Sequence, residues 1–320
     1  MKTFDVIIVG GGPAGSTCAF QLTRYGKKVL ILDRHQFPRL KLCAGWITPR
    51  VLHMLRFHPD DYPHGILEFK RLYFNIKGKK FALPTRQYSI RRYEFDNWLI
   101  QRSGATVIQH TVRHIIKDNG YFIIDDQFNA PIIVGAGGTN CPVYHQLFEP
   151  QAPRNPQDRI ATFEEEFPYE YTDNRCYLWF FENDLPGYSW YVPKGNGYVN
   201  VGIGAKIQTL KQRGENLREH WLNLIERIEA QGLVRNHKFQ NKGYQYFLRQ
   251  PIAEPQIGNA YIIGDAAGLA TVDMGEGIAP AIHSGLLAAQ AILTGKPLRF
   301  NRIARYSFWD LLFWWRWRKG

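Results

Sequence analysis

The chain has 320 residues and a mass of 37.1 kDa, with 45% hydrophobic and 21% charged residues. This length and composition exclude a disordered or fibrous chain and allow a large hydrophobic core. Lysine and arginine number 40 and aspartate and glutamate 28, which gives a formal charge of +12. The excess favours an anionic partner, such as a phosphorylated ligand or an acidic membrane surface. We expect no nucleic-acid partner, because no known binding module is recognisable.

The spacing of Cys18, Cys43, Cys141 and Cys176 fits neither a disulfide framework nor a Cys/His zinc cluster, and no histidine is singled out as a metal ligand. The sequence therefore predicts no metal and a reduced, cytoplasmic compartment. The apolar run 4–9 is too short and too quickly interrupted by glycine for a signal peptide. No apolar run is long enough to span a bilayer.

A strand, a glycine turn and a helix open the chain. Residues 4–9 are mostly apolar and rich in β-branched side chains, residues 10–15 read G-x-G-x-x-G, and residues 16–25 favour a helix. A second strand over 28–32 ends at Asp33. This order and spacing predict a dinucleotide-binding βαβ unit.

The chemistry of that unit explains its residue types. Gly10 permits the tight turn, Gly12 lets the backbone approach a pyrophosphate, and Gly15 allows close helix–strand packing. The helix start supplies N–H groups and a positive dipole end, and Asp33 can accept hydrogen bonds from a ribose. This fingerprint does not separate NAD from FAD. The expected contacts are Gly10, Gly12, Pro13, Ala14, Gly15, Asp33 and Arg34.

A second strand and glycine turn lie near the C-terminus. The apolar run 260–263 enters a G-D-A motif, and residues 273–278 lead into a small-residue helix over 279–293. These segments resemble the FAD-binding superfamily of aromatic hydroxylases and geranylgeranyl reductases. In that family the motif aspartate contacts the ribityl–pyrophosphate part of FAD, and the following helix start faces the isoalloxazine. The resemblance implies cofactor contacts for Gly264, Asp265, Gly275, Gly277 and Ile278.

Three further segments resemble geranylgeranyl reductase-like proteins in particular. Residues 37–47 resemble their FPRxKxCGG stretch beside the flavin, and residues 91–99 resemble their RxxFDxWL helix start. Residues 186–204 resemble the YxWxFPK…VNVGxG signature over the substrate cavity. The resemblance thus covers nearly the whole chain. It implies flavin contacts for Cys43, Ala44 and Arg92, and a substrate cavity lined by Trp46, Tyr188 and Trp190. Alternatively Tyr188 and Trp190 are core aromatics of a strand, since their spacing by two puts both on one face.

The implied activity is FAD-dependent reduction of C=C bonds in an isoprenoid or other lipid-like substrate. Reduced FAD would deliver hydride to one alkene carbon, and an acid would protonate the other. A cysteine at the position of Cys43 is important in archaeal members of the family, so Cys43 is the candidate catalytic residue. The alternative is a small core cysteine.

One departure from the family concerns residues 135–138. Relatives often carry G-A-D-G there, whereas this chain has Gly137 in place of the acid. In hydroxylase-like members that acid couples to NADPH use. The departure favours a protein electron donor, such as reduced ferredoxin, over NADPH.

Other functions stay open at this point. The run Tyr188-x-Trp190-x-Val192-Pro193 partly resembles the WxWxIP motif of flavin halogenases, so a flavin monooxygenase or halogenase is one alternative. An electron-transfer dehydrogenase that reduces quinone is a second. A non-catalytic flavin- or lipid-binding protein is a third.

The expected fold class is mixed α/β: a Rossmann-type FAD-binding domain interleaved with an antiparallel β-sheet substrate domain. Alternation of apolar and polar residues predicts a hairpin within 66–83, and further strands are expected within 161–181 and 188–205. Apolar residues on one helical face predict an amphipathic helix that ends at Gly232. The expected boundaries are 1–59, 93–150 and 256–295 for the FAD-binding domain, 60–92 and 151–255 for the substrate domain, and 296–320 for a C-terminal tail.

The tail is aromatic and basic. It holds four of the nine tryptophans within the last 12 residues, with arginines on either side. Such a segment suits the headgroup level of a bilayer, which would make the protein peripheral at the inner membrane face. Alternatively it packs on the protein and closes the substrate tunnel.

Overall fold

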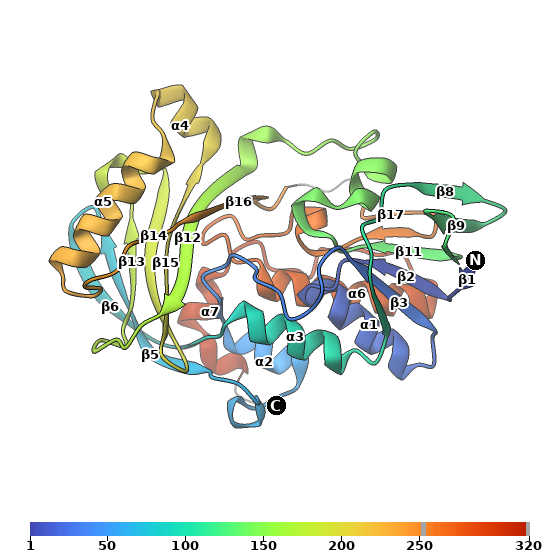
Figure 1. Ribbon diagram of the computed structural model, residues 1–320, viewed down its shortest axis with the longest axis horizontal. Helices are drawn as coiled ribbons and strands as arrows, with labels where there is room; N and C mark the ends of the chain where they lie inside the picture. Colours follow the sequence, from blue (N-terminus) through green and yellow to red (C-terminus); the bar gives the residue numbers. More distant parts are fainter. Residues whose placement is uncertain (251–253, 318–320) are drawn as a thin grey trace. The chain divides into compact units, whose positions relative to one another are not determined.

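The computed structural model of the chain describes residues 1–250 and 254–317 (Figure 1). The chain forms two compact units, each made of three separate segments. Unit 1 comprises Met1–Arg39, Phe95–Asn155 and Tyr246–Ser307, and unit 2 comprises Leu40–Glu94, Pro156–Gln245 and Phe308–Gly320.

The two longest differences from the expected boundaries concern residues 40–59 and 296–307, and residues 246–255 also belong to unit 1. Residues 40–59 belong to unit 2, because β4 (Trp46–Ile47) pairs with β6 (Lys79–Ser89) and α2 (Pro49–Leu55) packs on it. Residues 296–307 belong to unit 1, where backbone carbonyls of this segment accept hydrogen bonds from Arg249.

Unit 1 is built on a six-stranded sheet with the order β17-β18-β11-β2-β3-β7. All neighbours are parallel except the edge strand β17. The inner strands are apolar except for Asp33 at the end of β3, as expected when both faces of a parallel sheet are covered. This is the predicted Rossmann-type arrangement. The strands are β2 (Val6–Val9), β3 (Val29–Asp33), β7 (Thr106–Gln109), β11 (Ile132–Gly135), β17 (Gln256–Ile257) and β18 (Ala260–Ile262).

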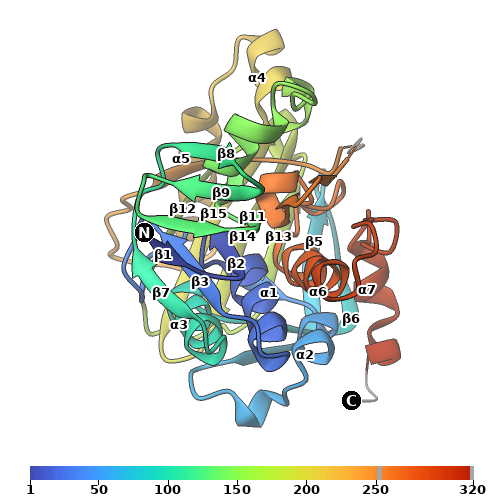
Figure 2. The same cartoon turned by 90° about the vertical axis from the view of Figure 1, so that its right-hand side faces the viewer.

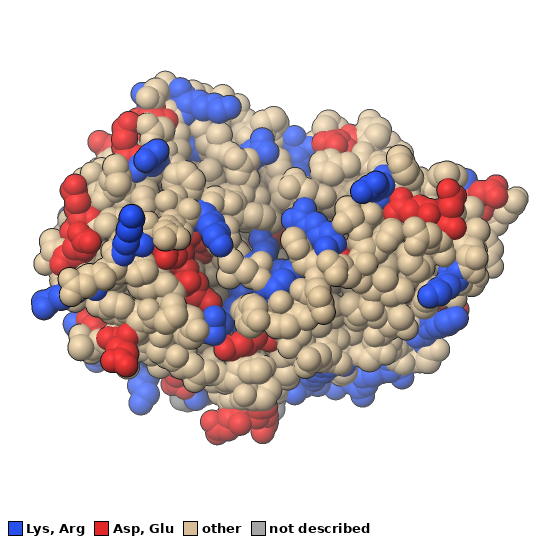
Figure 3. Space-filling model, viewed as in Figure 1, with Lys and Arg blue, Asp and Glu red and all other residues tan. Residues whose placement is uncertain are grey.

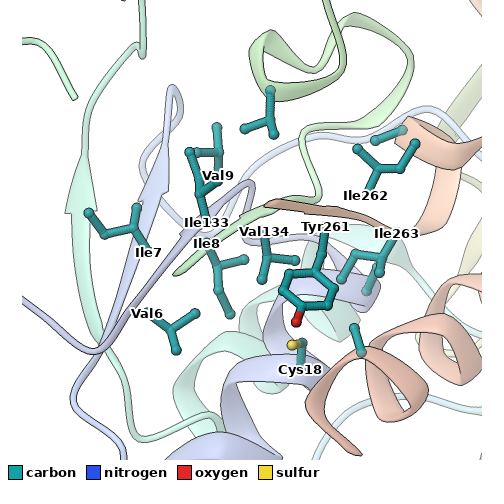
Figure 4. Close-up of a cluster of buried hydrophobic side chains, with 14 of the residues drawn as sticks. Val6, Ile7, Ile8, Val9, Cys18, Ile133, Val134, Tyr261, Ile262 and Ile263 are labelled. Atoms are coloured by element: carbon teal, nitrogen blue, oxygen red, sulfur yellow. The ribbon is translucent and has the colours of Figure 1, made fainter. Parts of the chain in front are cut away.

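Helices α1 (Pro13–Arg24) and α6 (Ile278–Thr294) pack side by side in unit 1 (Figure 2). Their backbones approach closely, because a Cβ atom added to Gly285 would collide with the carbonyl oxygen of Ala14. Figure 4 shows the core between the helices and the sheet, where Cys18 and Tyr261 lie among the β-branched side chains of β2, β11 and β18. Complete burial raises the pKa of Cys18 to about 12, so this thiol is an inert core residue.

A second sheet of unit 1 has the order β1-β10-β9-β8. The turn between β8 and β9 is Asn119-Gly120, and both residues have positive φ angles. Asn-Gly is a strong hairpin signal, so this hairpin could have been predicted from the sequence, although it is absent from the expected elements above. The strands are β1 (Lys2–Thr3), β8 (Ile115–Asp118), β9 (Tyr121–Ile124) and β10 (Phe128–Ala130).

Unit 2 is built on an eight-stranded sheet with the order β16-β12-β15-β14-β13-β5-β6-β4. We expected an antiparallel sheet, but β13 and β5 are parallel. Those two strands are far apart in the sequence and are joined by a long crossover, so no hairpin fixes an antiparallel pairing. The strands not yet named are β5 (Leu67–Ile76), β12 (Arg159–Pro168), β13 (Cys176–Phe180), β14 (Gly187–Lys194), β15 (Tyr198–Lys206) and β16 (Lys242–Phe247).

The expected hairpin joins β5 to β6 through Lys77 and Gly78, both at positive φ. One face of the sheet packs against α4 (Ile207–Arg213) and α5 (Leu217–Ala230), the predicted amphipathic helix. The opposite face carries the alternate residues of β12, β14 and β15, which contain the polar groups described below. The remaining helices are α3 (Arg92–Arg102) and α7 (Phe308–Leu312), with short helical turns at η1 (Pro59–Asp61), η2 (Gly138–Asn140), η3 (Tyr144–Phe148), η4 (Pro156–Asp158), η5 (Glu182–Asp184), η6 (Gly264–Ala267) and η7 (Trp314–Trp317).

Candidate functional site

The turn between β2 and α1 leaves no room for side chains at two of its glycines. A Cβ atom on Gly10 would collide with the carbonyl oxygen of Ala136, and one on Gly15 would collide with the carbonyl oxygen of Gly10. Gly12 caps α1 without a side-chain hydrogen bond, and Pro13 follows it. The first-turn N–H groups therefore have no intrahelical partner, and this helix end favours a negatively charged ligand.

Asp33 is buried at the end of β3 and holds the glycine turn in place. Its Oδ2 atom accepts a 2.8 Å hydrogen bond from the N–H of Gly11, and its Oδ1 atom accepts a 2.9 Å bond from the N–H of His35. Its contact with a ribose stays a prediction. The predicted Arg34 next to it is exposed, and its Nε atom donates to the Nε2 atom of His35.

Arg39, which is not among the predicted cofactor contacts, lies beside the same helix end. Its Nη2 atom is 3.4 Å from Oδ2 of the fully buried Asp96, and a Cβ atom on Gly12 would lie 3.6 Å from that Nη2. The Nε atom of Arg39 is buried and has no hydrogen-bond partner in the described part of the chain. A buried cation with an unused donor beside an uncapped helix start suits a phosphate group.

The second glycine turn follows β18 and contacts the first. Gly264 has a φ of +61°, its N–H donates to Ser284 Oγ at 2.9 Å, and its added Cβ would lie 3.0 Å from the Cβ atom of Ala14. Arg154 ties this turn to the one after β11, because its Nη atoms donate to the carbonyls of Thr139 and Ala266 at 2.7 and 2.6 Å. Two motifs from opposite ends of the sequence thus meet in unit 1.

The predicted residues at the start of α6 face the second turn. A Cβ atom on Gly277 would lie 3.4 Å from Oδ1 of Asp265, and Gly275 adopts a φ of +61°. Ile278 is buried. Glu276 caps the helix, since its Oε1 atom accepts a 2.6 Å hydrogen bond from the N–H of Ala279. Asp265 therefore lies against the helix start, and its contact with FAD stays a prediction.

These observations together test whether FAD fits unit 1. The unused donor of Arg39 and the uncapped start of α1 match the charge of a pyrophosphate, and the glycine turns let a ligand approach the backbone. Asp265 adds a carboxylate that can accept hydrogen bonds from hydroxyl groups. The residues present fit the dinucleotide.

Tyr188 and Trp190 lie on one face of β14 in unit 2, as their spacing predicted. The indole of Trp190 covers Gly202, where any added Cβ would collide with it, and its Nε1 atom donates to Asn200 Oδ1 at 2.7 Å. The ring of Tyr188 is 5.6 Å from that of Trp190 and stacks on Phe180 at 4.7 Å. The glycines of β15 thus make space for a large aromatic side chain.

Glu164 is a buried carboxyl group on the same face of the sheet. The Nδ2 atom of Asn200 lies 3.4 Å from its Oε2 atom. Burial raises the pKa of Glu164 to about 7, and the charges of Lys41 and Lys194 counteract only part of that effect. Glu164 was not among the residues predicted from the sequence. Two glutamates spaced by two, Glu164 and Glu166, in a predicted strand were the available signal, because they must share a face.

Cys43 is half-buried, whereas Cys18, Cys141 and Cys176 are fully buried. Its Sγ atom accepts a 3.4 Å hydrogen bond from the N–H of Gly45. The described chain therefore offers one accessible thiol.

The other predicted residues around Cys43 are also in unit 2. The carbonyl oxygen of Ala44 accepts a hydrogen bond from Lys194. Trp46 is buried, and its indole N–H donates a 3.1 Å hydrogen bond to Gln87 Oε1. Arg92 is also buried and is the first residue of α3. The predicted site residues thus form two groups, one within each unit.

Metal ligands and membrane spans are the remaining features that a functional site could involve. In residues 1–250 and 254–317 there is no group of three or more histidine, cysteine, aspartate or glutamate side chains arranged to hold a metal ion. Over the same residues, every helix is too short or too polar to cross a bilayer.

Comparison with known proteins places the chain in a family. A family model described as an FAD binding domain matches residues 3–58. An uncharacterized protein of Methanosarcina barkeri is 31% identical over 327 residues, which covers 91% of this chain and 75% of that protein. The geranylgeranyl diphosphate reductase of Rhodobacter capsulatus is 27% identical, with 95% and 80% covered. A digeranylgeranylglycerophospholipid reductase of Thermoplasma acidophilum is 28% identical, with 91% and 78% covered.

Solved structures share the fold. A geranylgeranyl bacteriochlorophyll reductase-like protein from Thermoplasma acidophilum matches with a TM-score of 0.80 at 22% identity, covering 100% of this chain and 89% of that one. A flavin-dependent brominase matches with a TM-score of 0.74 at 18% identity, with 97% and 84% covered. These findings confirm the predicted family and cofactor: the chain is an FAD-dependent oxidoreductase and belongs to the geranylgeranyl reductase-like family.

Proposed function

We propose that the enzyme reduces C=C bonds of an isoprenoid or related lipid-like substrate. Relatives that match over three quarters or more of their length are named as reductases of geranylgeranyl diphosphate or of a digeranylgeranyl phospholipid. The likeness to the brominase is at the level of fold, and it does not extend to the first tryptophan of the halogenase motif, where this chain has Tyr188.

The observation that carries the proposal is a row of aromatic rings on one face of the sheet of unit 2. Neighbouring rings lie 4.7 to 6.0 Å apart across four strands. Phe81, at one end of the row, is 48% exposed, whereas Phe74, Phe180 and Trp190 are buried. Such a row suits a long apolar chain, whose buried end would meet the polar groups Asn200 and Glu164. The row consists of Phe81, Phe74, Phe180, Tyr188 and Trp190.

Reduction of a C=C bond adds one hydride and one proton. FAD, when bound and reduced, supplies the hydride. We assign the proton to the Cys43 thiol, which would transfer it to the second alkene carbon and regain one from water afterwards. The half-buried position of Cys43 supports this role, because the fully buried Cys18, Cys141 and Cys176 cannot meet a substrate without local opening.

For the electron donor we favour a protein over NADPH. The position where relatives carry an acid is Gly137, and a Cβ atom there would lie 3.2 Å from Cys141 Cα and 3.3 Å from its Sγ. An aspartate would not fit this turn without a shift, so the local packing supports the departure seen in the sequence. A small electron-transfer protein such as reduced ferredoxin is the donor class that we propose.

We further propose that the C-terminal segment contacts a membrane surface. Its inner side packs on the rest of unit 2: the carbonyl oxygen of Asp310 accepts from Gln87 Nε2 at 3.2 Å, and that of the buried Leu311 accepts from Thr85 Oγ1 at 2.8 Å. Its outer side exposes Trp309 and Trp315 by 56% and 52%.

Lipid headgroups are the partner that this outer surface fits, because tryptophan and arginine are favoured at that level of a bilayer. Arg316 is exposed beside Trp315. Figure 3 shows that Lys and Arg side chains are also spread over the visible face, among the acidic ones. Anionic lipids would therefore be preferred. Arg318 and Lys319 lie outside the described residues.

An anaerobic single-turnover experiment tests the proposed reaction. The purified yellow protein is reduced chemically without oxygen and mixed with geranylgeranyl diphosphate or a geranylgeranylated phospholipid. We expect the oxidised flavin absorbance to return and the lipid to gain two hydrogen atoms for each reduced bond. Reoxidation only by oxygen would instead indicate a monooxygenase or halogenase, and reoxidation only by quinone a dehydrogenase. Either result, or no reoxidation at all, would overturn the proposal.

A further inference from the structure

Lys194 is a fully buried cation at the end of β14, in the motif that follows Trp190. Its Nζ atom donates to the carbonyl oxygen of Ala44 and, at 2.9 Å, to that of Ile90. It also lies 3.9 Å from Oε2 of Glu166. A buried ammonium group is tolerated only when it is paired, so the three contacts explain why a lysine can occupy this place.

The two carbonyls belong to a turn and to the strand end beside it. Gly45 adopts a φ of +64°, and an added Cβ there would collide with both the Ile90 carbonyl and the Lys194 ammonium. The N–H of Ile90 in turn donates to the Gly45 carbonyl at 2.8 Å. Gly45 also donates to the Sγ atom of Cys43. The turn from Cys43 to Gly45 is therefore held against β14 and the end of β6 through Lys194.

Charged groups facing Lys194 form a connected network. Glu166 accepts a 2.9 Å bond from Arg91 Nε, and Arg91 Nη1 donates to Glu94 at 3.1 Å. Glu164 and Cys43 also interact electrostatically with the lysine. Burial lowers the pKa of Lys194, while these acids act to raise it. The ammonium is thus held between the acidic strand β12 and the turn that carries the thiol.

We propose that Lys194 is a positioning residue for Cys43: by binding the Ala44 and Ile90 carbonyls it fixes the turn 43–45 and holds the thiol in one orientation. The inference rests on the proposed role of Cys43 for its catalytic meaning. The structural part of the proposal is that one buried ammonium group fixes the turn. That part depends only on the contacts of Lys194.

Hydrogen exchange measured by mass spectrometry on the full protein tests the fixing of the turn. In Lys194→Met both carbonyls lose their donor, so we expect amides of residues 43–46 and 90 to exchange about tenfold faster or more while the central sheet of unit 1 is unchanged. Lys206→Met is the matched control, because Lys206 is exposed at the end of the neighbouring strand β15. Lys194→Gln keeps one donor and replaces Lys194→Met if that variant does not fold. Unchanged exchange at residues 43–46 and 90 would overturn the proposal.

A second measurement separates positioning from a contribution to stability only. With flavin still bound, single-turnover reduction of the substrate should slow in Lys194→Met, and Lys194→Met combined with Cys43→Ala should be no slower than Cys43→Ala. Additive losses would show that Lys194 does not act through Cys43. Because hydrogen exchange needs no substrate, faster exchange in a protein that reduces no alkene would refute the proposed function and leave the role of Lys194 in the turn intact.

Discussion

The guanidinium group of Arg39 lies 3.4 Å from the carboxylate of Asp96, and both side chains are largely or fully shielded from solvent. A buried carboxylate needs a partner, so Asp96 fixes the direction of Arg39. The guanidinium then reaches Gly12 at the start of α1 with its Nε donor unused. This pair prepares a positive group at the helix end before any ligand arrives.

Arg39→Met should therefore weaken FAD binding. A hydrogen bond to a charged group contributes about 1.5–3 kcal/mol, so we expect the dissociation constant to rise by roughly tenfold to a hundredfold. Titration of the apo-protein with FAD, followed by flavin fluorescence, measures the change. Arg218→Met, on the exposed side of α5, is the control and should bind FAD as the unchanged protein does. Equal affinity in Arg39→Met would remove the assigned role.

The raised pKa of Glu164 predicts that the free energy of unfolding decreases as pH rises. Its pKa is raised from 4.5 to about 7 in the folded protein by burial, so between these values the native state keeps a proton that the unfolded state has lost. The free energy of unfolding should therefore fall by about 3 kcal/mol as pH rises from below 4.5 to above 7.

Urea unfolding at several pH values tests the titration of Glu164. Glu164→Gln, which carries no titrating group, should lack that part of the slope. Glu170→Gln removes an exposed glutamate and should keep it. If the slope is the same in Glu164→Gln, then the Glu164 carboxyl does not titrate with a raised pKa.

Local sequence patterns are sufficient to predict individual helices, strands and turns. They do not predict the contacts that join one element to another. The G-x-G-x-x-G turn, the G-D-A turn and the Lys77-Gly78 hairpin follow from residue types within about ten positions. The contact between Ala14 and Gly264 depends instead on how two distant helices pack. No spacing rule covers such a contact.

The missed functional groups share one property: each is a charged residue whose burial depends on tertiary packing. Lys194 and Glu164 lie in strands β14 and β12, and Arg39 lies in a loop motif. Lysine, arginine and glutamate are exposed in most proteins, so sequence alone favours the wrong environment for all three. Only the register of β12, β14 and β15 places Glu164 and Lys194 on one face of the sheet.

A thiol reagent should modify Cys43 selectively. Cys18, Cys141 and Cys176 are fully buried, and burial raises the pKa of each, so these thiols are both inaccessible and protonated at neutral pH. Brief treatment of the folded protein with iodoacetamide, followed by peptide mass spectrometry, should label Cys43 alone.

The variant Cys43→Ala tests what the accessible thiol does. It should keep bound FAD, because its loss leaves the glycine turns of unit 1 untouched, yet reduce substrate about a hundredfold more slowly, the usual scale for loss of an acid catalyst. Cys141→Ala is the control for a buried cysteine, with activity retained at somewhat lower stability. Full turnover in Cys43→Ala would show that another group supplies the proton.

The exposed tryptophans of the C-terminal segment predict binding to anionic vesicles. Burial of a large apolar side chain contributes about 1.5–3 kcal/mol, so Trp309→Ser and Trp315→Ser should each lower the partition coefficient by roughly tenfold or more. Sedimentation with phosphatidylglycerol vesicles measures it, and phosphatidylcholine vesicles should bind less protein because their surface has no net negative charge to attract Arg316. Tyr25→Ser, an aromatic that is 70% exposed in unit 1, serves as the control. Because the carbonyls of Asp310 and Leu311 hold the segment on Gln87 and Thr85 from its inner side, these substitutions should leave the melting temperature unchanged. Equal sedimentation of all variants would show that the tryptophans do not meet lipid.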